Sequence, residues 1–124
     1  MTRITIPYDI SVSINILLDL CKTHWSKYYK LQQDTVNLIY YYLKVQKIKP
    51  VEKYPVRIEF NWYMANKRRD CDNISTSKKF LIDALVKAGV LRNDGWEETS
   101  GGFEDHFYID RVNPRIEIII HPSE

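Results

Sequence analysis

The stretch of sequence that decides how this chain folds is KRRDCDNISTSKKFLIDALVKAGVLRNDGW, residues 67–96. Three consecutive cations precede two carboxylates, Asp70 and Asp72, which a single residue separates. Apolar side chains then recur at helical spacing, and Gly89 is the residue type that most often ends a helix. A third carboxylate, Asp94, follows that glycine. The stretch therefore predicts a helix that has acidic groups before and after it.

The acidic pair has two interpretations. If the backbone is extended there, the carboxylates of Asp70 and Asp72 point to the same side. A bound cation would relieve their repulsion, and Mg²⁺ suits them because it takes oxygen ligands and keeps waters for substrate phosphates. Alternatively, an Asx-type turn at this pair caps the next helix and leaves both carboxylates in solvent.

The cations beside the acidic pair strengthen the metal interpretation. Lys67, Arg68 and Arg69 come directly before Asp70. Cations in this position can hold a phosphate backbone while a metal ion sits at the scissile bond. The alternative is an ordinary solvated run of charge. Taken together, these residues favour a metal-dependent phosphodiesterase.

The predicted helix limits how closely Asp94 can approach Asp70. A helix over residues 74–88 would be roughly 22 Å long, and the segment 89–93 spans at most about 17 Å. The two carboxylates can therefore meet only if the helix starts later, near Thr76, or if the preceding turn leans back over it. The alternative for Asp94 is the turn formed by Asn93-Asp94-Gly95, which is a strong hairpin signal.

Lys79 also has two interpretations. It lies about two helical turns beyond Asp72 and could share that side of the helix. Alternatively, it forms a salt bridge with Asp83 at i+4, which is worth only a few tenths of a kcal/mol.

In order, these motifs resemble a known family. The matching segments are Arg68-Arg69-Asp70-Cys71-Asp72-Asn73, Lys78-Lys79, Asp83-Ala84-Leu85, Ala88-Gly89 and Asn93-Asp94. They resemble the RusA family of Holliday junction resolvases. Two further segments, Ser13-Ile14-Asn15 and Asn113-Pro114-Arg115-Ile116-Glu117, are similar to phage-borne members. The resemblance implies a RusA-like α+β fold, a small mixed β-sheet flanked by helices.

The resemblance also implies roles for the matching residues. Asp70, Asp72 and Asp94 match the carboxylates that bind the metal, which is Mg²⁺. Lys79 matches the catalytic lysine, and Lys78 is the alternative because the spacing before it is longer here. The expected catalytic set is therefore Asp70, Asp72, Lys79 and Asp94.

The implied activity is that of an endodeoxyribonuclease, a crossover junction endonuclease that resolves Holliday junctions and other branched DNA in recombination and repair. Lys67, Arg68, Arg69 and Lys78 are the expected DNA-binding residues. A four-way junction has two-fold symmetry and needs two cuts, so we expect a homodimer. The rival class is a non-catalytic, structure-selective nucleic-acid-binding protein, which would tolerate loss of the carboxylates.

Length and composition describe an ordinary globular chain. Its 124 residues suit one domain, 1–124, and the contents of 44% hydrophobic and 27% charged residues are usual. The net charge is only +2, but residues 22–57 hold eight Lys or Arg against two Asp or Glu, and residues 94–124 hold two against eight. This asymmetry indicates either a basic face for an anionic partner or simply an unevenly charged surface.

The remaining compositional features bear on the compartment. Cys21 and Cys71 are the only cysteines, which fits a reducing compartment, although a bridge between them is the alternative. The longest apolar stretch, residues 39–43, is too short to span a bilayer, and no signal peptide opens the chain. We therefore expect a cytoplasmic protein without membrane contact, in a bacterial host and of phage or prophage origin.

Hydrophobic patterning predicts the other elements. Strands are expected at residues 3–7 and 55–64, a helix start at 11–15 with apolar positions running on to Cys21, and a long helix over about 25–45. The tyrosines of this helix could stack on bases, but an aromatic stripe is more often core. An acidic loop is expected at 97–102, followed by two strands, 103–112 and 115–121, that pair around Asn113-Pro114.

Overall fold

The computed structural model describes residues 1–7 and 25–123. The helix start expected at residues 11–15, the apolar positions that follow it and the Ser13-Ile14-Asn15 match lie outside the described residues.

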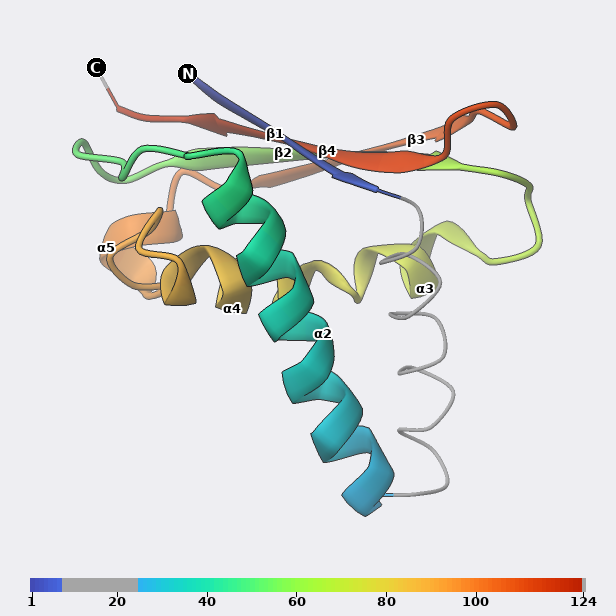
Figure 1. Cartoon of the computed structure of the whole chain (residues 1–124). Helices are drawn as coiled ribbons and strands as arrows, with labels where there is room; N and C mark the ends of the chain where they lie inside the picture. Colours follow the sequence, from blue (N-terminus) through green and yellow to red (C-terminus); the bar gives the residue numbers. More distant parts are fainter. Residues whose placement is uncertain (8–24, 124) are drawn as a thin grey trace.

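A four-stranded mixed sheet forms one layer of the fold (Figure 1). Its strands are β1 (Thr2–Pro7), β2 (Arg57–Met64), β3 (Phe103–Ile109) and β4 (Arg115–His121). They lie in the order β1-β4-β2-β3. β4 is antiparallel to both β1 and β2, whereas β3 is parallel to β2. The predicted α+β class with a small mixed sheet is confirmed.

The helices form the second layer. They are α2 (Trp25–Val45), α3 (Cys71–Ser75), α4 (Lys78–Lys87) and α5 (Trp96–Thr99). Figure 1 shows them on one side of the sheet, with α2 crossing α4. No described element covers the other side of the sheet, which we call the open face. None of the helices in the described ranges is both long and apolar enough to cross a membrane.

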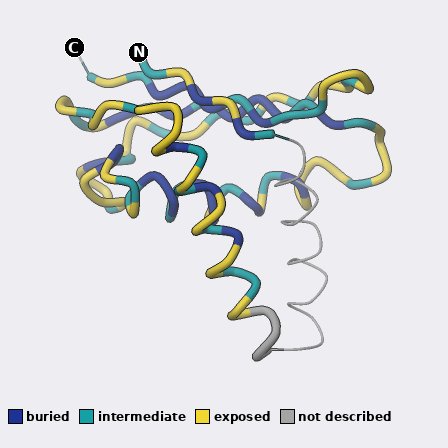
Figure 2. The backbone as a smooth tube through the Cα atoms, in the orientation of Figure 1, coloured by how far each residue is buried: buried dark blue, intermediate teal, exposed yellow. Residues whose placement is uncertain are grey.

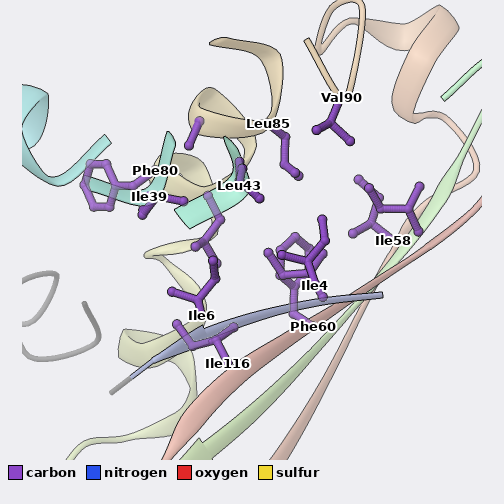
Figure 3. Packing of buried hydrophobic residues seen from close by; sticks show 14 of the residues in the cluster. Ile4, Ile6, Ile39, Leu43, Ile58, Phe60, Phe80, Leu85, Val90 and Ile116 are labelled. Carbon is purple, nitrogen blue, oxygen red and sulfur yellow. The ribbon is translucent and has the colours of Figure 1, made fainter. Parts of the chain in front are cut away.

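The core lies between these two layers. Alternation along β1, β2 and β4 directs every second side chain toward the helices, and the apolar faces of α2 and α4 pack against these side chains. Figure 3 shows the side chains that meet there, among them Ile4, Ile6, Ile58, Phe60, Ile116, Ile39, Leu43, Phe80 and Leu85. The core interpretation of the α2 tyrosines holds for Tyr42, which packs against the core, but Tyr29 and Tyr41 are exposed.

The expected hairpin between the last two strands is wrong. β3 and β4 are not neighbours, because β2 lies between them. The isoleucines of β4, at 116, 118, 119 and 120, are all buried, which suits a central strand. β3 has an exposed or half-buried side chain at every position and takes the edge.

The helix expected to be continuous from Ile74 is broken in two. Thr76 and Ser77 separate α3 from α4, and the hydroxyl of Ser77 donates to the carbonyl of Ile74 at 2.7 Å. Such side-chain bonds compete with regular helix geometry. The predicted alternative, a helix that starts near Thr76, is close to the observed start at Lys78.

The predicted stop at Gly89 is confirmed. Its φ is +75°, a left-handed conformation that glycine adopts without strain. The amide of Val90 donates to the carbonyl of Leu85 at 2.9 Å, and the amide of Gly89 donates to the carbonyl of Val86 at 3.0 Å. This pair of bonds is the Schellman motif, and it turns the chain sharply at the end of α4.

The segment after this turn forms neither a hairpin nor a wholly irregular loop. Asn93-Asp94-Gly95 leads into α5, whose first amide bonds, from Glu98 and Thr99, end on the carbonyl of Gly95. Glu98 is buried and accepts a hydrogen bond of 2.7 Å from Nε of Arg92. A short helix, tied through Glu98 to Arg92 of the preceding segment, therefore replaces part of the expected acidic loop.

Candidate functional site

The three predicted phosphate-binding cations lie on the connection between β2 and α3. Lys67 and Arg68 are exposed and Arg69 is half-buried. Figure 2 shows this connection as an exposed segment that descends from the sheet to the helix layer. The side-chain oxygen of Asn66 accepts the amide hydrogen of Arg68 at 3.0 Å, which folds the segment into a turn.

The acidic pair directly follows these cations, but not on a strand. Asp70 occupies the N-cap position of α3 with φ −70° and ψ 150°, and Asp72 lies in the first turn of that helix. The assumption of an extended backbone through both residues is therefore wrong. The capping alternative fails for Asp70 as well, because its carboxylate makes no capping hydrogen bond. Both side chains are exposed, and the carboxylate of Asp72 accepts a hydrogen bond of 3.0 Å from the adjacent amide of Asn73.

A pocket of about 340 Å³ opens beside the acidic pair, at the carboxyl ends of the parallel strands β2 and β3. The 66–71 connection lines one side of it with Lys67, Arg69 and Asp70, and the strand ends line the other with Tyr108 and Ile109. A cationic and acidic wall thus faces an aromatic and aliphatic wall, which is a combination that can receive both a phosphate and a base.

Lys79 and Asp94 lie together elsewhere. Nζ of Lys79 is 3.2 Å from Oδ1 of Asp83 and 4.0 Å from Oδ2 of Asp94. The lysine side chain is 67% exposed, so these ion pairs are screened and weak. The salt-bridge alternative for Lys79 is therefore realised, and the same lysine also adjoins the third predicted carboxylate.

Lys78 faces the opposite way from its neighbour. Its Nζ lies 2.7 Å from Oδ2 of Asp105. The same atom lies 5.5 Å from the ring centroid of Phe60 and 5.3 Å from that of Phe103. Indole Nε1 of Trp62 donates to the other oxygen of Asp105 at 2.9 Å. Lys78 therefore links α4 to the sheet, and Lys79 is the lysine of the two that faces solvent.

The structure does not gather the three predicted metal ligands in one chain. Asp70 and Asp72 lie at the start of α3, whereas Asp94 follows the end of α4 in the chain (Figure 1). Within residues 1–7 and 25–123, the only three potential metal ligands whose donor atoms all lie within 4.8 Å of one another are Glu59, Glu104 and His106. The prediction thus resolves into two separate places, an acidic pair with cations and a Lys79–Asp94 contact.

The Glu59 cluster lies on the open face and was not expected from sequence. Nη1 of Arg57 lies 2.6 Å from Glu104 and 3.2 Å from Glu59, and Nε2 of His121 lies 2.7 Å from Glu59. Although burial opposes the shift, hydrogen bonds from His121 and Arg57 lower the pKa of Glu59. A cation of the protein itself therefore already neutralises these carboxylates. Alternation along β2 points Glu59 outward, but only the register with β3 places it beside Glu104.

A second unexpected feature of the open face is a stacked column of three side chains. The rings of Tyr63 and Tyr108 lie 4.8 Å apart at 19°, and the guanidinium of Arg115 lies 3.9 Å from the ring centre of Tyr63. Burial and the nearby charge of Glu117 raise the pKa of Tyr63, so its phenol stays neutral at physiological pH. No local sequence signal joins these residues, because they come from three different strands.

No protein-family model matches the chain, and a search of curated proteins finds no relative.

Proposed function

We propose that this chain is a Mg²⁺-dependent endonuclease that cuts branched DNA, with Holliday junctions as the substrate class. The observation that carries the proposal is the exposed carboxylate of Asp70, which caps no helix and shares a pocket with Lys67. A structural role would have given that carboxylate a partner among the amides of α3.

The donor set beside this pocket suits Mg²⁺. This ion is usually held by one or two carboxylates, together with waters and substrate phosphates, and Asp70 and Asp72 provide two exposed carboxylates. Bound there, Mg²⁺ would activate water and polarise the scissile phosphate. Lys67 and Arg68 hold the neighbouring phosphates by charge, which fixes the DNA strand against the acidic pair.

Lys79 and Asp94 enter this proposal through the homodimer. A lysine next to the reacting phosphate stabilises the charge that develops on it. Since Lys79 and Asp94 lie apart from Asp70 within one chain, we propose that a homodimer brings these groups of one subunit to the acidic pair of the other. Two such sites related by two-fold symmetry match the two cuts that a four-way junction requires.

The test is incubation of the protein with a four-way junction, a plain duplex and a single strand, each with Mg²⁺ and with EDTA. We expect cleavage of the junction with Mg²⁺ alone. Asp72→Asn should abolish this cleavage and leave junction binding intact, whereas Glu97→Gln, an exposed carboxylate on α5, should change neither. Normal cleavage by Asp72→Asn would remove the metal assignment.

A second candidate function is a structure-selective nucleic-acid-binding protein without catalysis. It is favoured because, among the described residues, Asp94 does not join Asp70 and Asp72 in one close cluster of donor atoms. This candidate predicts salt-sensitive junction binding that is unchanged by EDTA, without cleavage under any condition. A binding affinity that does not depend on salt would count against both candidates.

A further inference from the structure

The stacked column on the open face ends in an unused ring surface. Tyr63 of β2 is paired in register with Arg115 of β4 on one side and with Tyr108 of β3 on the other. The column therefore runs across the sheet from Arg115 through Tyr63 to Tyr108. Since β3 is the edge strand among the described elements, no strand side chain lies beyond Tyr108. Tyr108 is accordingly 45% exposed.

The inner end of the column is held rigidly. Nη1 of Arg115 lies 2.9 Å from Oδ2 of Asp110 and donates to the carbonyl of Asn113, and its Nε lies 2.9 Å from Oε1 of Glu117. A guanidinium fixed in this way supports the ring of Tyr63 in one orientation, and Tyr63 in turn supports Tyr108. The exposed ring is thus preorganised, so a ligand that stacks on it loses little conformational freedom to the protein.

The surroundings of Tyr108 indicate what would stack there. Tyr108 is part of the wall of the 340 Å³ pocket that also contains Lys67, Arg69 and Asp70. A planar group on the ring would therefore have cations within the same pocket for an attached phosphate. Nucleotides combine these two properties, because every base offers a π-face and every backbone link carries a negative charge.

We propose that the exposed ring of Tyr108 is a stacking platform for an unpaired DNA base, which continues the Arg115–Tyr63–Tyr108 column by one member. This inference rests on the DNA-binding part of the proposed function and not on cleavage. A base held there leaves its phosphate on the side of Lys67 and directs the strand toward Asp70. Tyr108 would thereby select DNA with an unstacked base next to a duplex, as occurs at a branch point.

The test uses branched DNA that carries the fluorescent adenine analogue 2-aminopurine at an unpaired position, in EDTA so that no cleavage occurs. Stacking on Tyr108 should quench the fluorescence of the analogue. Tyr108→Leu should relieve the quenching and weaken binding by about fivefold to 150-fold, which is the range expected for one stacked base. Tyr108→Phe should retain both, because it keeps the ring and loses only the hydroxyl.

The matched control is Tyr41→Leu, because Tyr41 is an exposed tyrosine on α2. Unchanged binding by Tyr108→Leu, or an equal loss in Tyr108→Phe and Tyr108→Leu, would overturn the proposal. Loss in Tyr41→Leu instead would assign stacking to the α2 tyrosines and also overturn it. If Tyr108→Leu fails to fold, Tyr108→Trp replaces it, and its indole fluorescence should be quenched by the oligonucleotide beyond the quenching seen in the unmodified protein.

Failure of this inference and failure of the nuclease proposal give different results. Junction cleavage that survives together with binding independent of Tyr108 removes the platform and leaves the nuclease. Binding that depends on Tyr108, without any cleavage, leaves the platform and supports the non-catalytic candidate.

Discussion

At the scale of single residues, the adjacent lysines of α4 differ in exposure and in expected role. Lys79 is mostly exposed and its ion pairs with Asp83 and Asp94 are screened. We expect Lys79→Met to change the free energy of unfolding by less than about 0.5 kcal/mol, the usual worth of an exposed pair. On a four-way junction, the same variant should lose turnover without losing affinity. A drop in thermal stability with normal turnover would show that the salt bridge is its whole role.

Lys78 should behave in the opposite way. Its side chain is 19% exposed, and its ammonium pairs with Asp105, which also accepts a hydrogen bond from the indole of Trp62. We expect Lys78→Met to cost about 1–3 kcal/mol in the free energy of unfolding, because the variant leaves a half-buried carboxylate without its cation. Chemical denaturation of Lys78→Met and Lys79→Met side by side measures the contrast. Equal stability of the two variants would contradict the assignment of Lys78 to the interior.

The pH dependence of the free energy of unfolding should reveal the contacts of Glu59 with His121 and Arg57. Hydrogen bonds from His121 and Arg57 give Glu59 a lower pKa in the folded protein than in the unfolded chain. Such a carboxyl stabilises the fold above its unfolded pKa, and this contribution is lost as the pH falls through its folded pKa. Between about pH 5 and about pH 3, the unmodified protein should therefore lose more stability than Glu59→Gln does. Glu52→Gln, at an exposed position, should follow the unmodified protein.

At the scale of elements, the turn after α4 decides where Asp94 is presented. The left-handed conformation of Gly89 permits the two Schellman hydrogen bonds. We expect Gly89→Ala to cost about 1–2 kcal/mol, since a Cβ is unfavourable in that conformation. Gly89→Asn should cost less, because asparagine tolerates it better. Thermal unfolding of both variants measures the difference, and equal melting temperatures would count against the left-handed turn.

Local patterns predicted most of the elements correctly. The bounds of α2, the buried side of β2 and the stop at Gly89 follow from helical spacing, alternation and turn chemistry, all of which act between near neighbours in sequence. The pairing of β3 does not follow from such local signals. A short connection favoured a β3–β4 hairpin, but the burial of four isoleucines in β4 placed that strand in the middle of the sheet.

The candidate site was predictable to a similar extent. Sequence identified Lys67, Asp70 and Asp72 as neighbours because they are neighbours along the chain. It could not place Asp94, whose position depends on the break at Ser77 and on the turn after α4. The Tyr63–Tyr108 stack was also invisible, because it depends on the register between strands that lie far apart in sequence.

At the scale of the whole molecule, the dimer proposal makes a prediction about mixed variants. If each site combines Asp72 of one subunit with Asp94 of the other, Asp72→Asn and Asp94→Asn are each inactive alone. A heterodimer of the two contains one doubly altered site and one intact site. Mixing the variants after joint unfolding and refolding should therefore restore nicking of a junction to a measurable level.

The control is a mixture of Asp72→Asn with the double variant Asp72→Asn/Asp94→Asn, which contains no intact site in either arrangement. If neither mixture nicks the junction, and mass spectrometry shows that subunits have exchanged, each site lies within a single subunit. The separation of Asp94 from the acidic pair would then have to close by a movement of the chain itself.

The pairing of β1 with β4 has a consequence for how the protein is made. Every described strand contact of β1 is with β4, which is the last strand in the sequence. During translation, β1 emerges before β4 and cannot pair with a described strand until β4 has also left the ribosome. The β1 side of the sheet therefore cannot form until β4 has been synthesised. Until then, Ile4 and Ile6, which are buried in the folded protein, remain exposed on the nascent chain and can associate with other apolar surfaces.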